Sequence, residues 1–110
     1  MTLEQGAHPR HRLDDLLQNA VRFSIVAALD RAGTLGFRDV RDAVEITDSA
    51  LSKQVAALET AGYVAVGKAF VGKTPRTSLT LTRDGRAAWR GHLDALRQIA
   101  GSDQESPGHH

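Results

Sequence analysis

The sequence contains no cysteine, only three prolines and only five aromatic residues: three Phe, one Tyr and one Trp. Without thiols, disulfides, thiolate metal sites and thiol redox sensing are all excluded. With so few aromatics, a core has to be built mainly from aliphatic side chains and alanines. No run of about 18 apolar residues is present, and no signal peptide is recognisable, so we expect neither a membrane span nor export. These absences favour a cytoplasmic protein.

The length of 110 residues is that of one domain. A chain of this size buries only about 60–65% of the surface that it exposes when unfolded. A partner subunit would therefore add burial that the monomer lacks.

The net charge of +1 is unevenly distributed along the chain. Residues 1–47 hold six basic and seven acidic side chains, and residues 87–110 hold two basic and three acidic ones. Residues 48–86, in contrast, hold six basic and three acidic side chains. This central excess of positive charge is what one face of a phosphate-binding protein requires, although it is modest.

The most informative pattern is a capped helix within residues 46–64. Thr47 or Asp48 can act as the N-cap, and Gly62 stands where a helix usually ends in the left-handed conformation. The apolar residues at i, i+4 and i+7 share one face, which predicts a buried stripe of Leu51, Val55 and Leu58.

The opposite face of that helix is small, polar and basic near its N-terminal end. Side chains of this kind can meet base edges in the major groove of DNA, and none of them is a large hydrophobe. We therefore predict a recognition helix whose outward residues are Ser49, Ala50, Ser52, Lys53 and Gln54.

The flanking segments complete a winged helix-turn-helix. Residues 36–46 predict a short helix that precedes a tight connection. Residues 63–68 alternate as a strand, residues 72–76 supply a turn stiffened by Pro75, and residues 77–81 form a second strand. This hairpin, the wing, has a basic tip suited to the phosphate backbone or the minor groove, with the candidate contacts Lys68, Lys73, Thr74 and Arg76. Phe70 and Val71 either pack against the recognition helix or touch sugars.

The remaining segments predict three more helices and a short strand. Helices begin at Leu13 and at Val21, and the second ends before Gly33. Residues 34–36 form a brief third strand, and a terminal helix capped by Thr82 spans residues 83–100. The predicted fold is α+β, mainly α, with a three-helix core, the wing and an added terminal helix. Residues 12–100 form this domain between a mobile arm (residues 1–11) and a disordered tail (residues 101–110).

Several of these features together resemble a known family. They are the helix of residues 46–64, the basic wing ending at Arg76-Thr77, and the run Leu79-Thr80-Leu81-Thr82-Arg83-Asp84-Gly85-Arg86. The chain is similar, from about residue 13 to residue 99, to single-domain winged-helix transcriptional regulators of the MarR and ArsR type. The resemblance implies a homodimer that binds double-stranded DNA at promoters.

The terminal helix carries an apolar stripe that predicts dimerisation. Its spacing is close to a heptad, and a helix beyond the wing is poorly placed to be covered by its own small domain. The interface would join this stripe to leucines of the N-terminal helix, which gives the set Leu13, Leu16, Leu17, Trp89, Leu93, Leu96 and Ile99. The alternative is that the stripe packs into the core of its own chain.

Neither catalysis nor metal binding is supported by the residue pattern. Four of the five histidines lie in the predicted tails, where His109 and His110 resemble a tag remnant, and no pair lies at i, i+4 on a predicted helix. No glycine-rich loop leads from a strand into a helix, and no serine has a recognisable histidine and carboxylate around it. We therefore expect no enzyme activity, no metal and no cofactor.

The residue pattern is compatible with two classes of function. The first is a sequence-specific transcriptional regulator, with a small-molecule effector left open in a pocket between the dimer helices and the core. The second is a winged helix used for protein–protein assembly without base readout. The exposed polar and basic residues of the recognition helix and wing favour DNA.

Overall fold

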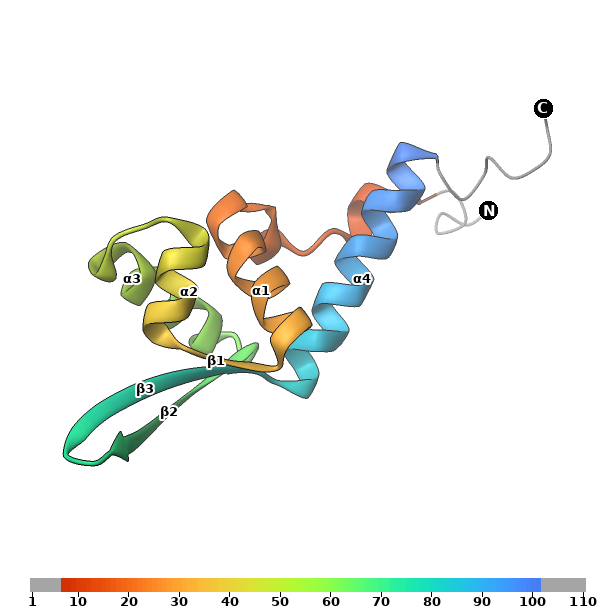
Figure 1. Ribbon diagram of the computed structural model, residues 1–110. Coiled ribbons are helices and arrows are strands. Elements are labelled where there is room, and N and C mark those ends of the chain that lie inside the picture. The colour runs from red at the N-terminus through yellow and green to blue at the C-terminus, as the bar shows by residue number, and fades with distance from the viewer. Residues whose placement is uncertain (1–6, 102–110) are drawn as a thin grey trace.

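The computed structural model describes residues 7–101 (Figure 1). Two short 3-10 helices come first and are followed by four α-helices and three strands. In chain order these elements are η2 (Pro9–Arg12), η3 (Asp15–Gln18), α1 (Ala20–Ala32), β1 (Thr34–Gly36), α2 (Phe37–Val44), α3 (Asp48–Thr60), β2 (Val64–Val71), β3 (Thr74–Leu81) and α4 (Arg83–Ala100). This is the predicted winged helix fold, with a helical core, a β-hairpin wing and an added terminal helix.

The sheet is antiparallel, with the strand order β1-β3-β2. The short β1 pairs with the inner part of β3, from Thr34 opposite Thr80 to Gly36 opposite Ser78. The long β2 pairs with the whole of β3, and its last pair is Val71 with Thr74. The outer half of the hairpin extends past α2 and α3, away from the helices (Figure 1).

The ends of α3 and α4 are set by local side chains, as predicted. The Thr47 side chain accepts a hydrogen bond from the backbone N–H of Ala50 at 3.1 Å, and Gly62 after the helix has φ 84°. The Thr82 hydroxyl accepts from the N–H of Gly85 at 2.9 Å and donates to the carbonyl of Gly62 at 2.6 Å. Thr82 therefore caps α4 and also ties it to the end of α3. Within residues 7–101, no helix has the length and apolar character needed to cross a membrane.

The core lies between α1, α2, α3 and the inner face of the sheet. The predicted stripe of α3 is buried in it, and from α1 and α2 come Val26, Leu29 and Val40, all fully buried. Further members are Leu17, Ile25, Leu51, Val55, Leu58, Val64, Leu79, Leu81 and Trp89. Each residue of this set removes a mainly apolar side chain from water, which is the principal stabilisation available to so small a domain.

One close approach fixes α4 against the corner that joins α3 to β2. A Cβ added at Gly85 would lie 2.2 Å from the backbone oxygen of Tyr63 and 2.8 Å from Cδ1 of Leu81. Glycine is therefore required in this turn of the helix, despite its poor intrinsic helix propensity.

The N-terminal region differs from its prediction in two ways. The helix expected from Leu13 is a 3-10 helix at Asp15–Gln18, capped by the carboxylate of Asp14, which accepts from the N–H of Leu16 at 2.9 Å. The mobile arm was expected to reach residue 11, but Pro9–Arg12 form a 3-10 helix that packs on α4. Residues 1–6 of that arm lie outside the described residues.

At the other end of the chain, Gly101 follows α4 with φ 82°, and its N–H bonds back to the last turn of the helix. Residues 102–110 of the predicted tail, including His109 and His110, lie outside the described residues.

The loop of the wing is shorter than predicted. Only Gly72 and Lys73 connect the strands, and Gly72 has φ 65°, as a two-residue hairpin loop favours at its first position. Pro75 lies within β3, opposite Phe70, instead of in the turn. Because β1 ends opposite Ser78, β3 has no neighbour on one side at Pro75, which is where a strand tolerates proline.

Trp89 and Leu17 are core residues of their own chain. Trp89 is buried, and its ring lies 4.7 Å from that of Phe23, centroid to centroid. Leu17 of η3 is also buried. For these two side chains the intrachain alternative is correct and the predicted dimer contact is wrong, because almost no surface is left for a partner to cover.

Candidate nucleic-acid interface

Two arginines hold α3 in place. Arg41 near the end of α2 bonds Asp48, the first residue of α3, at 2.8 Å, and bonds Asp42 at 2.9 Å. These hydrogen bonds raise the pKa of Arg41 above its ordinary value. Arg22 of α1 donates from Nη1 to Oε1 of Gln54 at 2.8 Å and from Nε to the carbonyl of Leu16 at 2.7 Å. The recognition helix is therefore fixed to both preceding helices.

The solvent face of α3 matches the prediction in part. Ser49, Ser52 and Lys53 are exposed, as expected of residues that meet a ligand. Ala50 and Gln54, however, are half-buried, and the amide oxygen of Gln54 is occupied by Arg22. For Gln54 the prediction of an outward side chain is wrong, since Arg22 of α1 holds its amide, whereas Ala50 stays partly exposed. The exposed stripe instead continues to Ala56, which sequence reasoning missed.

The predicted wing residues all lie on the projecting part of the hairpin. Every residue from 67 to 76 is exposed, a range that contains Lys68, Lys73, Thr74 and Arg76. Phe70 and Val71 are 71% and 61% exposed. Phe70 therefore does not pack against the recognition helix, which removes one of the two roles expected for it.

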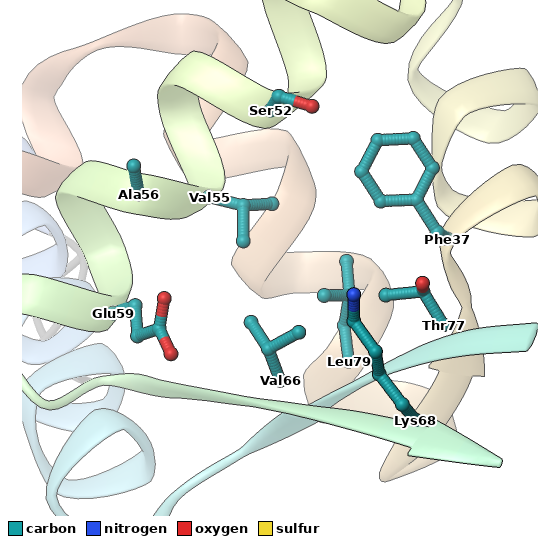
Figure 2. A pocket seen from close by; sticks show the side chains of 9 residues that line it. All are labelled: Phe37, Ser52, Val55, Ala56, Glu59, Val66, Lys68, Thr77 and Leu79. Atoms are coloured by element: carbon teal, nitrogen blue, oxygen red, sulfur yellow. The ribbon is translucent and has the colours of Figure 1, made fainter.

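An open groove of about 350 Å³ separates α3 from the wing (Figure 2). Ser52, Val55, Ala56 and Glu59 line it from α3, and Phe37 closes one end. The opposite wall comes from the sheet, with Val66 and Lys68 on β2 and Thr77 and Leu79 on β3. The recognition helix and the inner face of the wing thus border one concave surface.

The wing belongs to a stretch of sequence whose charge has one sign, whereas Glu59 of α3 is an acidic residue that lines the groove. Between Glu59 and Asp84 every charged side chain is basic, and these residues are Lys68, Lys73, Arg76 and Arg83. The wing, which holds Lys68, Lys73 and Arg76 and no acidic residue, therefore attracts a polyanion and offers flexible cations to its phosphates.

A polar cluster of Asp14, Tyr63 and His92 joins segments that are distant in sequence. The N–H of Asp14 donates to Nδ1 of the buried His92, and the Tyr63 hydroxyl donates to the Asp14 carboxylate. The hydrogen bond to Asp14, together with burial, raises the pKa of Tyr63 to about 12. Burial lowers the pKa of His92. Sequence reasoning missed this cluster, because no local pattern relates its members.

The apolar stripe of α4 is only partly covered by its own chain. Leu96 and Ile99 are 37% and 41% exposed, and Leu93 is half-buried. In the N-terminal segment, residues 7–19, Leu13 and Leu16 are also half-buried. Unlike Trp89 and Leu17, these five side chains retain surface that a partner could cover.

A mostly apolar cavity of about 400 Å³ lies between the N-terminal segment, α1 and α4. Its lining is Leu13, Leu17, Gln18, Ala20, Phe23, His92 and Leu96. Among residues 7–101, no group of three or more His, Asp or Glu side chains is arranged to hold a metal ion.

Comparison with known proteins agrees with this geometry. Residues 21–100 match the family model described as a winged helix DNA-binding domain. This match covers most of the chain, so the protein belongs to that family. No curated protein sequence matches the chain significantly.

Solved structures of transcriptional regulators share the fold. A transcriptional regulator homologue from Pyrococcus horikoshii is 22% identical with a TM-score of 0.75, and the match covers 84% of this chain and 91% of that one. BpsR from Bordetella bronchiseptica is 23% identical with a TM-score of 0.66, over 90% and 74% of the two chains. A MarR family transcriptional regulator from Silicibacter pomeroyi is 16% identical with a TM-score of 0.63, over 81% and 59%. The fold is thus that of MarR-like regulators.

Proposed function

We propose that this protein is a sequence-specific transcriptional regulator that binds duplex DNA as a homodimer. The observation that carries the proposal is the concave surface bordered by α3 and the wing, whose projecting part bears cations and no acidic residue. In this arrangement α3 enters the major groove and the wing lies on the backbone or in the minor groove. DNA as the ligand also favours a cytoplasmic location.

The contacts divide into base readers and phosphate contacts. Ser49, Ser52 and Lys53 are exposed on α3 and carry donors or acceptors for base edges. The wing residues Lys68, Lys73, Thr74 and Arg76 supply cations and a hydroxyl for phosphate oxygens. Gln54 acts indirectly, because its hydrogen bond to Arg22 of α1 supports the position of the helix, and Ala50 offers only a half-buried methyl group.

The dimer would be closed by the uncovered part of the α4 stripe. Leu93, Leu96 and Ile99 would meet the same surface of a second copy, together with Leu13 and Leu16, around a two-fold axis. Two-fold symmetry would place the recognition helices about 34 Å apart, or a small multiple of it, and make the operator an inverted repeat.

Binding to duplex DNA as a function of salt tests the proposal. The wild-type protein should bind a random-sequence duplex at low salt and release it as salt rises. The Lys73→Ala variant should bind more weakly, and the slope of log affinity against log salt should become shallower by about one unit. Selection from a random pool should then yield an inverted repeat. A protein that ignores duplex DNA at low salt contradicts the proposal.

The second candidate is a protein–protein assembly module without base readout. The exposed Phe70 and Val71 favour it, because a protein-binding winged helix more often displays hydrophobic residues there. The selection experiment separates the two functions, since an assembly module would enrich no sequence.

A small-molecule effector would fit the cavity between the N-terminal segment, α1 and α4. Its volume of about 400 Å³, apolar walls and single histidine suit a small aromatic compound. The DNA binding of BpsR, which shares this fold, is regulated by 6-hydroxynicotinic acid. A small aromatic compound should raise the melting temperature of the wild type, and this rise should be lost in an Ala20→Trp variant, whose indole would occupy the cavity without changing a residue of the proposed dimer interface.

A further inference from the structure

The wing ends in an apolar tip that residues 7–101 leave uncovered. Phe70 and Val71 are the large hydrophobic side chains exposed on the wing, and the other two in the described part of the chain, Leu96 and Ile99, belong to α4. A hairpin needed only for phosphate contacts has no use for an exposed phenyl ring, since its cations alone would serve. The exposed tip therefore indicates a binding partner that has an apolar surface.

Strand register gives the two hydrophobic side chains opposite directions. Alternate residues of a strand face the same side, so Phe70 shares the face of Val66 and Lys68, which line the groove beneath α3. The partner of Phe70 on β3 is Pro75, and this pair continues the face beyond the pair of Lys68 with Thr77. Val71 lies on the opposite face. Phe70 and Pro75 thus form the apolar end of the surface that α3 borders.

The surroundings of the tip select an anionic partner. Lys68, Lys73 and Arg76 are the charged residues of the hairpin, and it contains no acidic residue. The minor groove of DNA combines the two required properties, because apolar sugar edges and base steps lie between two rows of phosphates. It would also be reached from the same protein face that places α3 in the major groove.

We propose that Phe70, backed by Pro75, enters the minor groove and contacts sugars and a base step there, while Lys73 and Arg76 bind the flanking phosphates. This inference rests on the proposed DNA-binding function and adds a second specificity element to it. A wedge of this kind favours steps that unstack easily, such as pyrimidine–purine steps. The operator should therefore show a preference at positions that α3 does not reach.

Affinity for a random-sequence duplex, measured across a range of salt, separates the wedge from the cations. Phe70→Ala should weaken binding about tenfold, equivalent to about 1.4 kcal/mol, with the salt slope unchanged. Phe70→Leu should retain most of the affinity. Val71→Ala is the matched control, since Val71 is similarly exposed but lies on the opposite face, and it should bind as the wild type does. Both side chains are exposed, so the melting temperatures of all three variants should stay close to that of the wild type.

A direct signal comes from Phe70→Trp. The native Trp89 is buried, so the added indole supplies the exposed component of the emission. Its fluorescence should be quenched by the duplex if the ring stacks on bases. In sequences selected by Phe70→Ala, the preference flanking the α3 contacts should be lost, whereas the preference read by α3 should remain.

Several outcomes would overturn the inference. If Phe70→Ala binds as the wild type does while Lys73→Ala is weakened, the wedge is wrong and the DNA-binding function stands. If the wild type does not bind duplex DNA at low salt, the wedge and the DNA-binding function are both wrong. If Phe70→Ala abolishes binding to vesicles of anionic phospholipid, or self-association, but leaves duplex affinity unchanged, the partner of the tip is a membrane or another copy.

Discussion

The backbone N–H of Asp14 donates a hydrogen bond to Nδ1 of His92 at 2.9 Å, across 78 residues of sequence. Nδ1 can accept this hydrogen bond only while it carries no proton, which requires the His92 ring to be neutral. The bond attaches the N-terminal segment to α4, at the wall of the cavity between them. Protonation of the buried His92 at Nδ1 would therefore remove the hydrogen bond that joins these two segments.

We predict that the protein loses stability as the pH falls below about 6.5. Burial lowers the pKa of His92 beneath its ordinary value of 6.5, against the opposing charge of Asp14. The unfolded chain then takes up the proton more readily, so this contribution to stability is present above pH 6.5 and is lost as the pH falls through the lower, folded-state pKa. Melting temperatures between about pH 7.5 and 5 measure the effect. His92→Asn offers an acceptor without titrating, and it should flatten the curve; an unchanged curve would contradict the prediction.

The single tyrosine gives a second, spectroscopic test of the same cluster. Its hydrogen bond to the Asp14 carboxylate raises the pKa of Tyr63 to about 12 from its ordinary value of 10.0. Absorbance titration of the phenol should therefore have a midpoint near 12 in the wild type and move toward 10 in Asp14→Asn. Asp15→Asn is the control, because the Asp15 carboxylate bonds Gln18 and not the phenol. Equal midpoints in all three proteins would show that Asp14 does not hold the ring.

Lys53 and Gln54 are adjacent in sequence but should behave differently on substitution. Lys53→Ala should cost about 1–3 kcal/mol on a selected operator and relax the preference at one base position. Gln54→Ala should lower the melting temperature, because it removes the partner of Arg22, while the order of preferred sequences stays the same. Affinity and selection profiles of both variants decide this. A changed base preference in Gln54→Ala at unchanged stability would make Gln54 a direct reader.

Two glycines of α4 should respond to alanine with opposite signs. At Gly85 the new methyl group would overlap the backbone of Tyr63, so we expect a loss of about 1–3 kcal/mol or more in the free energy of unfolding. At Gly91 nothing lies within 4 Å of the added Cβ, and alanine should stabilise the helix by up to about 1 kcal/mol. Denaturant titration of both variants measures the difference. A neutral Gly85→Ala would mean that the corner between α3 and β2 yields easily.

The dimer should dissociate when charge is placed on the exposed stripe of α4. Leu96→Glu should sediment as an 11.9 kDa monomer that keeps its fold, since the side chain is 37% exposed in the single chain. Ala87→Glu adds the same charge to the opposite side of the same helix and should stay dimeric. DNA affinity should fall with dissociation, because the two half-sites are no longer coupled. If the wild type is already monomeric and still binds an inverted repeat tightly, the proposed dimer is wrong.

The parts of the fold that depend on local chemistry were predictable from the sequence. Thr47 and Gly62 bound α3 through hydrogen bonds and a backbone conformation within a few residues, and the stripe of α3 follows from helical spacing. The position of Gln54 was not predictable, because its partner Arg22 lies 32 residues away. A helical pattern shows which side chains share a face, but not which neighbouring helix covers the edge of that face.

The same distinction explains the errors in the stripe of α4. Heptad-like spacing groups Trp89 with Leu93 and Leu96, yet the Trp89 ring packs on Phe23 and only the later residues stay exposed. Periodicity cannot show where the domain stops covering a long helix. His92 was missed because its donor, Asp14, is distant, and Pro75 was placed in the turn because proline usually marks turns.

Pro75 within β3 has a consequence for how the protein behaves at high concentration. In the alternating ladder of a hairpin closed by Val71 and Thr74, the next pair, Phe70 and Pro75, is the non-hydrogen-bonded one, so the nitrogen of Pro75 faces the open edge of β3. That edge therefore lacks a donor at the point where another strand would join it. Lys73 and Arg76 beside it repel a second hairpin. The β3 edge of the wing is thus protected against the addition of a further strand beside the exposed phenyl ring, whereas β2 forms the other edge of the sheet.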